Sequence, residues 1–295
     1  MPAYLDAIVA AHRADRARDG RNVGELRTTA LAHRTQRRPA DRRDFVASLL
    51  QGHRDLGMAV ISEIKRRSPS KGDLDPDLDV AATAADYQAG GARAISVLTD
   101  VEFFGGSVED LVLARASCEL PCLRKDFTID AVDLYDAVLM NADAVLLIAA
   151  VLEDNELATL LALADELGLA ALVEVHDETE LIRALHAGSR LVGVNQRDLR
   201  TFEVDRERAL ALGRSMPDDV VAVAESGIRD AEDVRQLAEA GYRAVLVGET
   251  LVRAGDRTAA LGDLLSRVTG VAGATSQNGH HGNAGSPVGS EGSAL

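Results

Sequence analysis

Residues 57–268 alternate strictly between short apolar runs and longer amphipathic stretches, and this alternation constrains the fold more than any other feature. The runs have the length and composition of buried strands, and the stretches between them repeat apolar residues at helical spacing. The predicted strands are Ala59–Ile61, Ala94–Leu98, Cys122–Leu123, Ala144–Ile148, Ala171–Val175, Leu191–Val194, Val220–Ala224 and Ala244–Val247. The predicted helices are Val80–Ala89, Ser107–Ala116, Ala131–Leu139, Asn155–Leu167, Glu178–Ala187, Arg206–Leu212, Ala231–Ala240 and Ala259–Val268.

Alternating strand–helix units predict a parallel sheet covered by helices, and eight such units close into a (β/α)8 barrel, the TIM-barrel architecture. The main alternative within the α/β class is a doubly wound sheet. That fold usually carries a glycine-rich turn after its first strand, and no GxGxxG sequence follows Ile61. We therefore expect a single (β/α)8 barrel.

Two further zones flank the alternating region. Residues 1–56 are rich in arginine and helical in pattern, with Leu5, Ile8, Val9 and His12 at helical spacing, so they predict an N-terminal helical extension. Residues 269–295 are rich in glycine and serine and have no periodicity, which predicts a disordered tail. The expected domain organisation is one barrel domain over residues 1–268, extension included, followed by the tail.

Composition excludes several classes of function. A net charge of −15, an aromatic content of 3% and the absence of tryptophan disfavour a nucleic-acid-binding protein, which needs a basic surface or stacking platforms. No stretch approaches the roughly 20 apolar residues of a membrane span. Only Cys118 and Cys122 are present, which is too few for a disulfide scaffold. We expect a cytoplasmic protein without nucleic-acid or membrane partners.

A glutamate and a lysine lie two residues apart, at Glu63 and Lys65, directly after the apolar run Met58–Ile61. Side chains alternate faces along a strand, so these two point the same way. Inside a barrel, this pair of charges would meet in a partly dry space, where a charge is costly unless it is paired. An ordinary structural ion pair at a strand edge remains an equal alternative at this point.

Polar residues follow six of the predicted strands, and active sites of barrels lie at the C-terminal strand ends. Glu174 interrupts an otherwise apolar strand, so it is either protonated or paired with a cation, and both states suit acid–base chemistry. Lys125 follows an apolar segment in the same way. Gly227 and Gly248 follow the last two strands, where barrels often bind phosphate. The polar groups at strand ends are Glu63 and Lys65, Arg124–Phe127, Glu174, Asn195–Arg197, Glu225–Gly227 and Gly248-Glu249.

Six segments resemble the signature motifs of the indole-3-glycerol-phosphate synthase family, and they occur in the family's order along about residues 3–268. The resemblance implies an N-terminal helical extension, a (β/α)8 barrel and an enzyme of tryptophan biosynthesis. The implied reaction converts 1-(2-carboxyphenylamino)-1-deoxyribulose 5-phosphate into indole-3-glycerol phosphate, carbon dioxide and water. The segments are ISEIKRRSPSKG at 61–72, FFGGS at 103–107, LRKDF at 123–127, LVEVH at 172–176, GVNQRDL at 193–199 and AESGI at 224–228.

The resemblance also implies residue roles, with no metal and no organic cofactor. Lys125 would be the general acid of ring closure, Glu174 its acid–base partner, and Lys65 a group that contacts the substrate and stabilises developing charge. Glu63 and Asn195 would complete the catalytic set by holding substrate hydroxyls or the other side chains. The implied substrate-binding residues are Arg197, Glu225, Ser226, Phe104, Phe127 and Ser68, and the implied phosphate site comprises Gly227, Gly248, Glu249 and Lys65. The expected partner is the small phosphosugar–anthranilate substrate, bound by a monomer or weak homo-oligomer.

Two positions depart from the family's pattern. Gln196 stands where asparagine is common, and Glu249 stands where a small hydroxyl residue is common. A carboxylate would repel phosphate, so only the backbone N–H of Glu249 is expected to serve there. A Schiff-base lyase or aldolase acting on a phosphosugar through Lys125 is the alternative enzyme. A catalytically inactive barrel is a third possibility, although none of the expected positions is disrupted.

Overall fold

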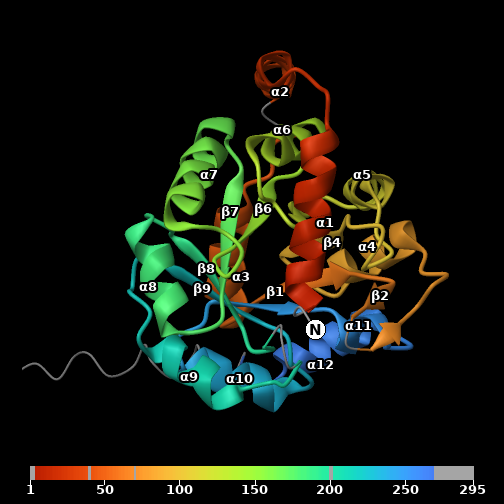
Figure 1. Cartoon of the computed structure of the whole chain (residues 1–295). Coiled ribbons are helices and arrows are strands. Elements are labelled where there is room, and N and C mark those ends of the chain that lie inside the picture. The colour runs from red at the N-terminus through yellow and green to blue at the C-terminus, as the bar shows by residue number, and fades with distance from the viewer. Residues whose placement is uncertain (1–3, 39–40, 70, 199–201, 269–295) are drawn as a thin grey trace, which may run out of the picture.

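The computed structural model describes residues 4–38, 41–69, 71–198 and 202–268, and within them the predicted strands close into a parallel barrel (Figure 1). The order around the barrel is β1-β10-β9-β8-β7-β6-β5-β4, and β1 closes the ring by pairing with both β10 and β4. The barrel strands are β1 (Ala59–Ile64), β4 (Ala94–Leu98), β5 (Cys122–Lys125), β6 (Ala144–Ile148), β7 (Ala170–Val175), β8 (Leu191–Asn195), β9 (Val221–Glu225) and β10 (Ala244–Val247).

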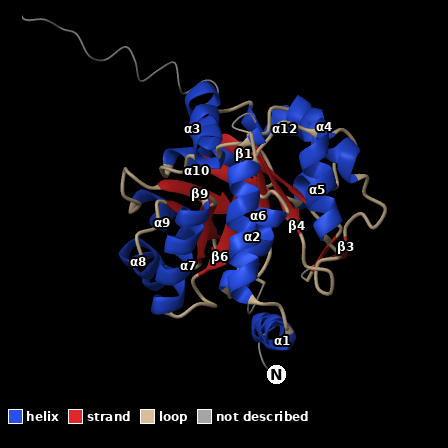
Figure 2. Cartoon of the chain, turned by 90° about the horizontal axis from the view of Figure 1, so that it is seen from above, coloured by secondary structure: helices blue, strands red, loops and turns tan. Residues whose placement is uncertain are grey.

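Helices follow the strands and form the outer wall, as Figure 2 shows. Most of them begin after an aspartate or serine whose side chain accepts a hydrogen bond from a backbone N–H in the first turn, as Asp79, Ser107 and Asp177 do. The helices are α4 (Val80–Ala89), α5 (Val108–Ser117), α6 (Ala131–Leu139), α7 (Asp154–Leu167), α8 (Glu178–His186), α9 (Arg206–Arg214), α10 (Ala231–Glu239), α11 (Glu249–Val252) and α12 (Arg257–Leu265).

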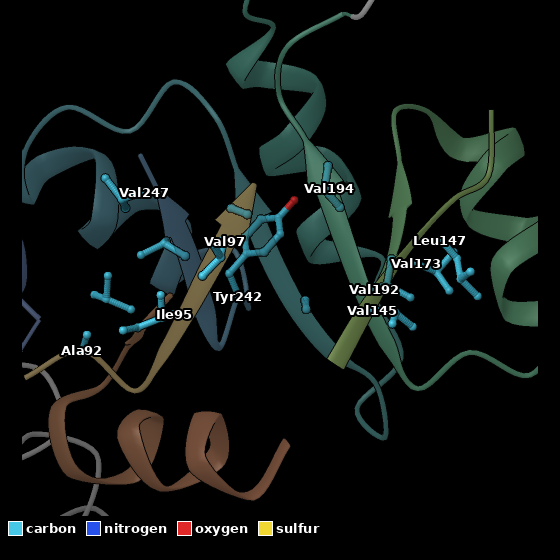
Figure 3. Packing of buried hydrophobic residues seen from close by; sticks show 14 of the residues in the cluster. Ala92, Ile95, Val97, Val145, Leu147, Val173, Val192, Val194, Tyr242 and Val247 are labelled. Atoms are coloured by element: carbon cyan, nitrogen blue, oxygen red, sulfur yellow. The ribbon is translucent and has the colours of Figure 1, made fainter. Parts of the chain in front are cut away.

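Strand residues alternate between two apolar clusters, as expected for strands with one face toward the helices and one toward the barrel interior. In β6, Val145 and Leu147 belong to the outer cluster, whereas Ala144, Leu146 and Ile148 belong to the inner one. Figure 3 shows part of the outer cluster. Burial of both faces explains why these strands are nearly continuous apolar runs in the sequence.

The N-terminal extension consists of α1 (Tyr4–Arg18), α2 (Val23–Gln36) and α3 (Phe45–Leu56). The helices α1 and α3 lie at opposite ends of the barrel (Figures 1 and 2). Both contribute to the inner apolar cluster, α1 through Leu5 and Ile8 and α3 through Phe45 and Leu49. The ring of His12 in α1 lies 5.2 Å from the ring of Phe127, which follows β5, so α1 covers the end of the barrel where the strands finish.

The structure confirms the predicted fold and corrects several boundaries. Four strands run past the predicted ends, β1 to Ile64, β5 to Lys125, β8 to Asn195 and β9 to Glu225, because the polar residues near their ends still pair within the sheet. A short antiparallel pair that the sequence did not predict, β2 (Arg67–Ser68) with β3 (Gly72–Asp73), lies between β1 and α4. No helix among the described residues is long and apolar enough to cross a membrane.

Some expectations fall on residues outside the described part of the chain. These are the tail at 269–295 and, within the quoted motifs, Ser70 and Leu199. The predicted domain boundary at residue 268 therefore stays a prediction.

Candidate active site

Four charged side chains form one layer at the C-terminal end of the barrel interior. Glu63, Lys125, Glu174 and Glu225 come from alternate strands, β1, β5, β7 and β9, and TIM-barrel interiors are built from such layers of four. The three glutamates are at most 4% exposed. The layer two residues earlier on the same strands is entirely apolar and fully buried, and consists of Ile61, Leu123, Leu172 and Val223.

Lys125 is the cation of this layer. Its Nζ lies 3.5 Å from Glu174 Oε2 and 4.0 Å from Glu225 Oε2. Burial lowers the pKa of Lys125, but the carboxylates of Glu174, Glu225 and Glu63 outweigh burial and raise the pKa above its usual value. Lys125 is therefore an ammonium group at neutral pH and can donate a proton.

Glu174 is held by three partners. Asn195 Nδ2 donates a hydrogen bond to Glu174 Oε1 over 3.1 Å, and His176 Nε2 lies 3.4 Å from the same oxygen. Burial raises the pKa of Glu174, but Lys125, His176 and Asn195 together lower it well below its usual range. Glu174 is thus a carboxylate in the free protein and a candidate base.

His176 is fixed by the helix that follows it. Its backbone N–H and its Nδ1 both contact Glu180 Oε2, at 2.8 and 3.0 Å. Burial lowers the pKa of His176, but Glu174 and Glu180 raise it to about 10. The sequence placed His176 in a motif without giving it a role. Its position two residues after Glu174 was the available signal that the two side chains share a face of the strand.

Glu225 contrasts with Glu174 although the two are neighbours. Burial raises the pKa of Glu225, the carboxylate of Glu174 raises it further, and Lys125 offsets only part of this, so the pKa reaches about 8. Glu225 Oε1 is buried without a hydrogen-bond partner among the described residues. A Cβ at Gly193 would approach this oxygen to 2.0 Å, so β8 needs glycine there to make room for the carboxyl group.

The expected pair of Glu63 and Lys65 is present. Lys65 Nζ donates a hydrogen bond to Glu63 Oε1, and both side chains line the mouth of the barrel. Gly248, at the end of β10, faces this pair, because a Cβ there would lie 2.5 Å from Glu63 Oε1 and 3.1 Å from Lys65 Nζ. One position expected to bind phosphate therefore also creates space for the charged pair.

Two phenylalanines form an apolar wall beside the charged layer. Phe104 and Phe127 have ring centroids 6.3 Å apart at an interplanar angle of 41°. Phe127 is 9% exposed and belongs to the inner apolar cluster. An aromatic ring could lie against this wall, since aromatic groups favour offset and tilted contacts.

The opposite side of the mouth carries an unusual backbone. Ser226 has a φ of +64° and Gly227 a φ of +69°. A positive φ is uncommon for a residue with a side chain, and such conformations cluster at ligand sites. Gln196 Nε2 holds this turn by donating to the carbonyl oxygen of Ser226 over 2.7 Å. Glu249, which departs from the family's pattern, lies 3.6 Å from Arg253 Nε.

The charged layer, the two phenylalanines and the Ser226-Gly227 turn surround one cavity of about 680 Å³, within the usual size range of small-molecule sites. Every site residue expected from the sequence lines it, including Ser68 and Arg197. The sequence missed four further cations. Lys71 lay in a quoted motif, and Arg253 follows Glu249 at helical i,i+4 spacing, whereas Arg206 and Arg229 gave no signal. The lining cations are Lys65, Lys71, Lys125, Arg197, Arg206, Arg229 and Arg253.

The cysteines take no part in this site. Cys122 begins β5 and Cys118 ends α5, so both lie at the opposite end of the strands, and both are buried and unbridged.

Comparison with known proteins bears on the family. The family model for indole-3-glycerol phosphate synthase matches residues 5–264. An indole-3-glycerol phosphate synthase of Chromobacterium violaceum is 52% identical over 193 residues, which cover 65% of this chain and 73% of the relative. One from Parafrankia sp. is 48% identical over 229 residues, 78% of this chain and 82% of the relative.

Among solved structures, a 3-hexulose-6-phosphate synthase matches with a TM-score of 0.58 at 17% identity, covering 71% of this chain and 99% of that one. This likeness concerns the fold alone. The family match spans the barrel, the charged layer and the glycine-containing turns described above. The chain belongs to the indole-3-glycerol phosphate synthase family.

Proposed function

We propose that this protein acts on a small-molecule substrate as an indole-3-glycerol phosphate synthase, the activity named for its relatives. It would close the indole ring of 1-(2-carboxyphenylamino)-1-deoxyribulose 5-phosphate with loss of carbon dioxide and water. The observation that carries the proposal is the charged layer. One buried ammonium group faces a carboxylate and a carboxyl group, and together they can donate and accept protons at a single cavity.

Ring closure comes first in the proposed mechanism. The aromatic carbon that bears the carboxylate attacks the keto carbon of the sugar chain, and the carbonyl oxygen gains negative charge. Lys125 is the proton donor for this oxygen, because the raised pKa keeps it an ammonium group at neutral pH and this ammonium lies in a desolvated site beside the developing charge. Carbon dioxide then leaves and returns its bonding electrons to the aromatic ring.

Dehydration completes the proposed mechanism. The hydroxyl group formed from the ketone leaves as water, which requires an acid, and a base must remove a proton from the new five-membered ring. Glu174 is the better base, because its partners keep it ionised, and Lys125 or the protonated Glu225 can supply the acid. Lys65 stabilises developing charge, while Glu63 and Asn195 hold Lys65 and Glu174 in place.

Substrate binding follows the asymmetry of the cavity. We assign the anthranilate ring to the apolar wall of Phe104 and Phe127 and the phosphate to the opposite turns. Backbone N–H groups of Ser226, Gly227, Gly248 and Glu249, together with Lys65, form the proposed phosphate site. We assign the sugar chain to Arg197 and Ser68, which also line the cavity.

The Schiff-base alternative is less well supported. A lysine must be a neutral amine to attack a carbonyl, and the carboxylates around Lys125 favour its charged form. We further infer a cytoplasmic enzyme that works as a monomer or weak homo-oligomer without nucleic acid. Its two cysteines are free and its net charge is −15.

The proposed function is tested by turnover of the anilino-deoxyribulose phosphate, followed through the fluorescence of indole-3-glycerol phosphate. Wild-type protein should be active, and Lys125→Ala should lower kcat by about 10²–10⁴-fold, the range typical of a lost general acid. Absence of turnover by folded wild-type protein would contradict the proposal. Trapping of a substrate adduct on Lys125 by borohydride would favour the alternative.

A further inference from the structure

Three titratable side chains meet beside the cavity, outside the charged layer. His12 comes from α1, Asp100 follows β4 and Asp126 follows β5. His12 Nε2 lies 3.0 Å from Asp100 Oδ2 and 4.0 Å from Asp126 Oδ1. The two aspartates are 6% exposed and line the cavity, whereas His12 does not. His12 is thus linked to the site only through other residues.

Each of these aspartates fixes one phenylalanine of the apolar wall. Asp100 Oδ1 accepts hydrogen bonds from the backbone N–H groups of Phe103 and Phe104, at 2.6 and 3.1 Å. Asp126 Oδ1 accepts one from the N–H of Phe127 at 2.8 Å. The His12 ring also packs on Phe127, with centroids 5.2 Å apart. A single imidazole therefore touches both loops that carry the wall.

The charges around His12 favour its protonated form. Asp100 and Asp126 contact the imidazole, and Asp133 of α6 lies nearby. Of the neighbouring cations, Arg124 pairs with Asp126 at 2.8 Å, and Arg16 pairs with Asp133 at 3.3 Å. Burial lowers the pKa of His12, but the hydrogen bond to Asp100 and the charges of the aspartates raise it above its usual value.

The same three groups could bracket a metal ion, but the atoms that would bind it already have partners. His12 Nε2 is hydrogen-bonded to Asp100 Oδ2, and Asp126 Oδ1 accepts from the N–H of Phe127. The other aspartate oxygens are occupied as well. Asp126 Oδ2 already accepts hydrogen bonds from Thr99 and Arg124, at 2.5 and 2.8 Å. Asp100 Oδ1 is taken by two backbone N–H groups. A proton on the imidazole supplies the positive charge that the cluster requires.

We propose that protonated His12 is a positioning residue, which docks α1 onto the mouth of the barrel and holds Phe104 and Phe127 in place for the aromatic ring of the substrate. This inference rests on the proposed function. It assigns to the N-terminal helix a part in substrate affinity rather than in the chemical steps. The lysine and glutamates of the charged layer do not contact His12, so kcat should be nearly independent of it.

The dependence on pH has a definite sign. The pKa of His12 is higher when α1 is docked, so protonation of His12 favours docking. This contribution to the free energy of docking is complete below the usual histidine pKa. The contribution is lost as pH rises through the raised pKa of His12. KM of the wild-type enzyme should therefore increase with pH, relative to a variant that carries a permanent charge at this position.

The test measures KM and kcat between pH 6 and 9.5 for wild type, His12→Lys and His12→Gln. Comparison of each variant with wild type at every pH cancels the ionisation of the substrate itself. His12→Gln should raise KM about tenfold at the acid end, as expected for loss of a charge-assisted hydrogen bond, and the difference should shrink as pH rises. His12→Lys should keep a low KM at the alkaline end, where wild type weakens.

Arg13→Gln is the matched control, since Arg13 lies on the same helix, is about half exposed and pairs with Glu156 at 3.6 Å, away from the aspartates. It should leave the KM profile of wild type unchanged. Substrate binding to the Lys125→Ala protein, with and without His12→Gln, provides a readout that needs no turnover.

The outcomes separate the two proposals. If wild type does not turn over the substrate, the proposed function fails, whatever the His12 variants do. If wild type is active but His12→Gln has the KM of wild type at every pH, or lowers only kcat, the positioning role is wrong. A KM that responds to a metal chelator but not to pH would replace the proton with a metal ion and also overturn it.

Discussion

Two adjacent layers of the barrel interior come from the same four strands and have opposite properties. The layer of Ile61, Leu123, Leu172 and Val223 is wholly apolar and dry, whereas the layer of Glu63, Lys125, Glu174 and Glu225 consists wholly of ionisable side chains. Only two residues, roughly 6–7 Å along each strand, separate them. Burial of the apolar layer stabilises the fold by about 1.5–3 kcal/mol per side chain.

The charged layer contributes much less to the stability of the fold, because desolvation of buried charges offsets much of their attraction. It persists because opposite charges lie side by side and because one glutamate keeps its proton. The contrast indicates a division of labour. The apolar layer, called the lower layer below, holds the strands together, and the charged layer, called the upper layer, performs chemistry. Changes in the two layers should therefore affect different measurements.

The largest expected effect is on turnover in the upper layer. Glu174→Gln removes the proposed base while keeping nearly the same shape, so kcat should fall by about 10²–10⁴-fold. The melting temperature should change only slightly, in contrast to the large loss of kcat. Steady-state kinetics and thermal unfolding check the two quantities on the same preparation.

Glu178→Gln is the matched control for this change, because Glu178 is exposed and lies only four residues along the chain. It should retain wild-type kcat. An active Glu174→Gln enzyme would remove Glu174 from the mechanism and would weaken the contrast between the layers.

The next effect should appear in stability and not in chemistry. Leu172 is fully buried in the lower layer, two residues before Glu174. Leu172→Ala should lower the free energy of unfolding by about 2–5 kcal/mol, the usual result of a cavity left in a core. Urea unfolding measures this loss, and kcat at a temperature where the variant is fully folded should stay within about threefold of wild type. A loss of kcat as large as that of Glu174→Gln would show that the layers are not separable.

The sequence could predict the fold and the members of the upper layer, but not their protonation states. A strand predicted from an apolar run ends at the first charged residue, so β5 and β9 were predicted too short. Lys125 and Glu225 were nevertheless placed at strand ends. Glu174 was expected to be either protonated or paired. Which state holds depends on Lys125, His176 and Asn195, and three-dimensional distances decide this.

Other parts of the site depend on contacts between distant segments and left little trace in the sequence. Gly193 is needed because Glu225 lies against it, although the two are 32 positions apart. The pairing of His12 with Asp100 joins the N-terminal extension to the barrel across 88 positions. His12 entered the sequence reading only as one residue of a helical pattern. Long-range pairs of this kind follow from the closure of the barrel, which local spacing does not encode.

The smallest expected effect concerns the pH dependence of stability and tests the charged layer from within. The pKa of Glu225 is about 8 in the folded protein and near 4.5 when the carboxyl group is free. A raised pKa means that the unfolded chain releases this proton at lower pH, so the stability that the protonated group contributes is present below about pH 4.5 and declines as pH rises to about 8. Glu225→Gln removes the titration while keeping a neutral group of similar shape. Relative to this variant, wild type should lose on the order of 3 kcal/mol of unfolding free energy between pH 5 and pH 8. Urea unfolding at several pH values measures the difference.

Glu207→Gln on the exposed face of α9 serves as the control. If the unfolding free energies of wild type and Glu225→Gln ran parallel over this pH range, Glu225 would be ionised like Glu174, and the upper layer would then hold an uncompensated carboxylate.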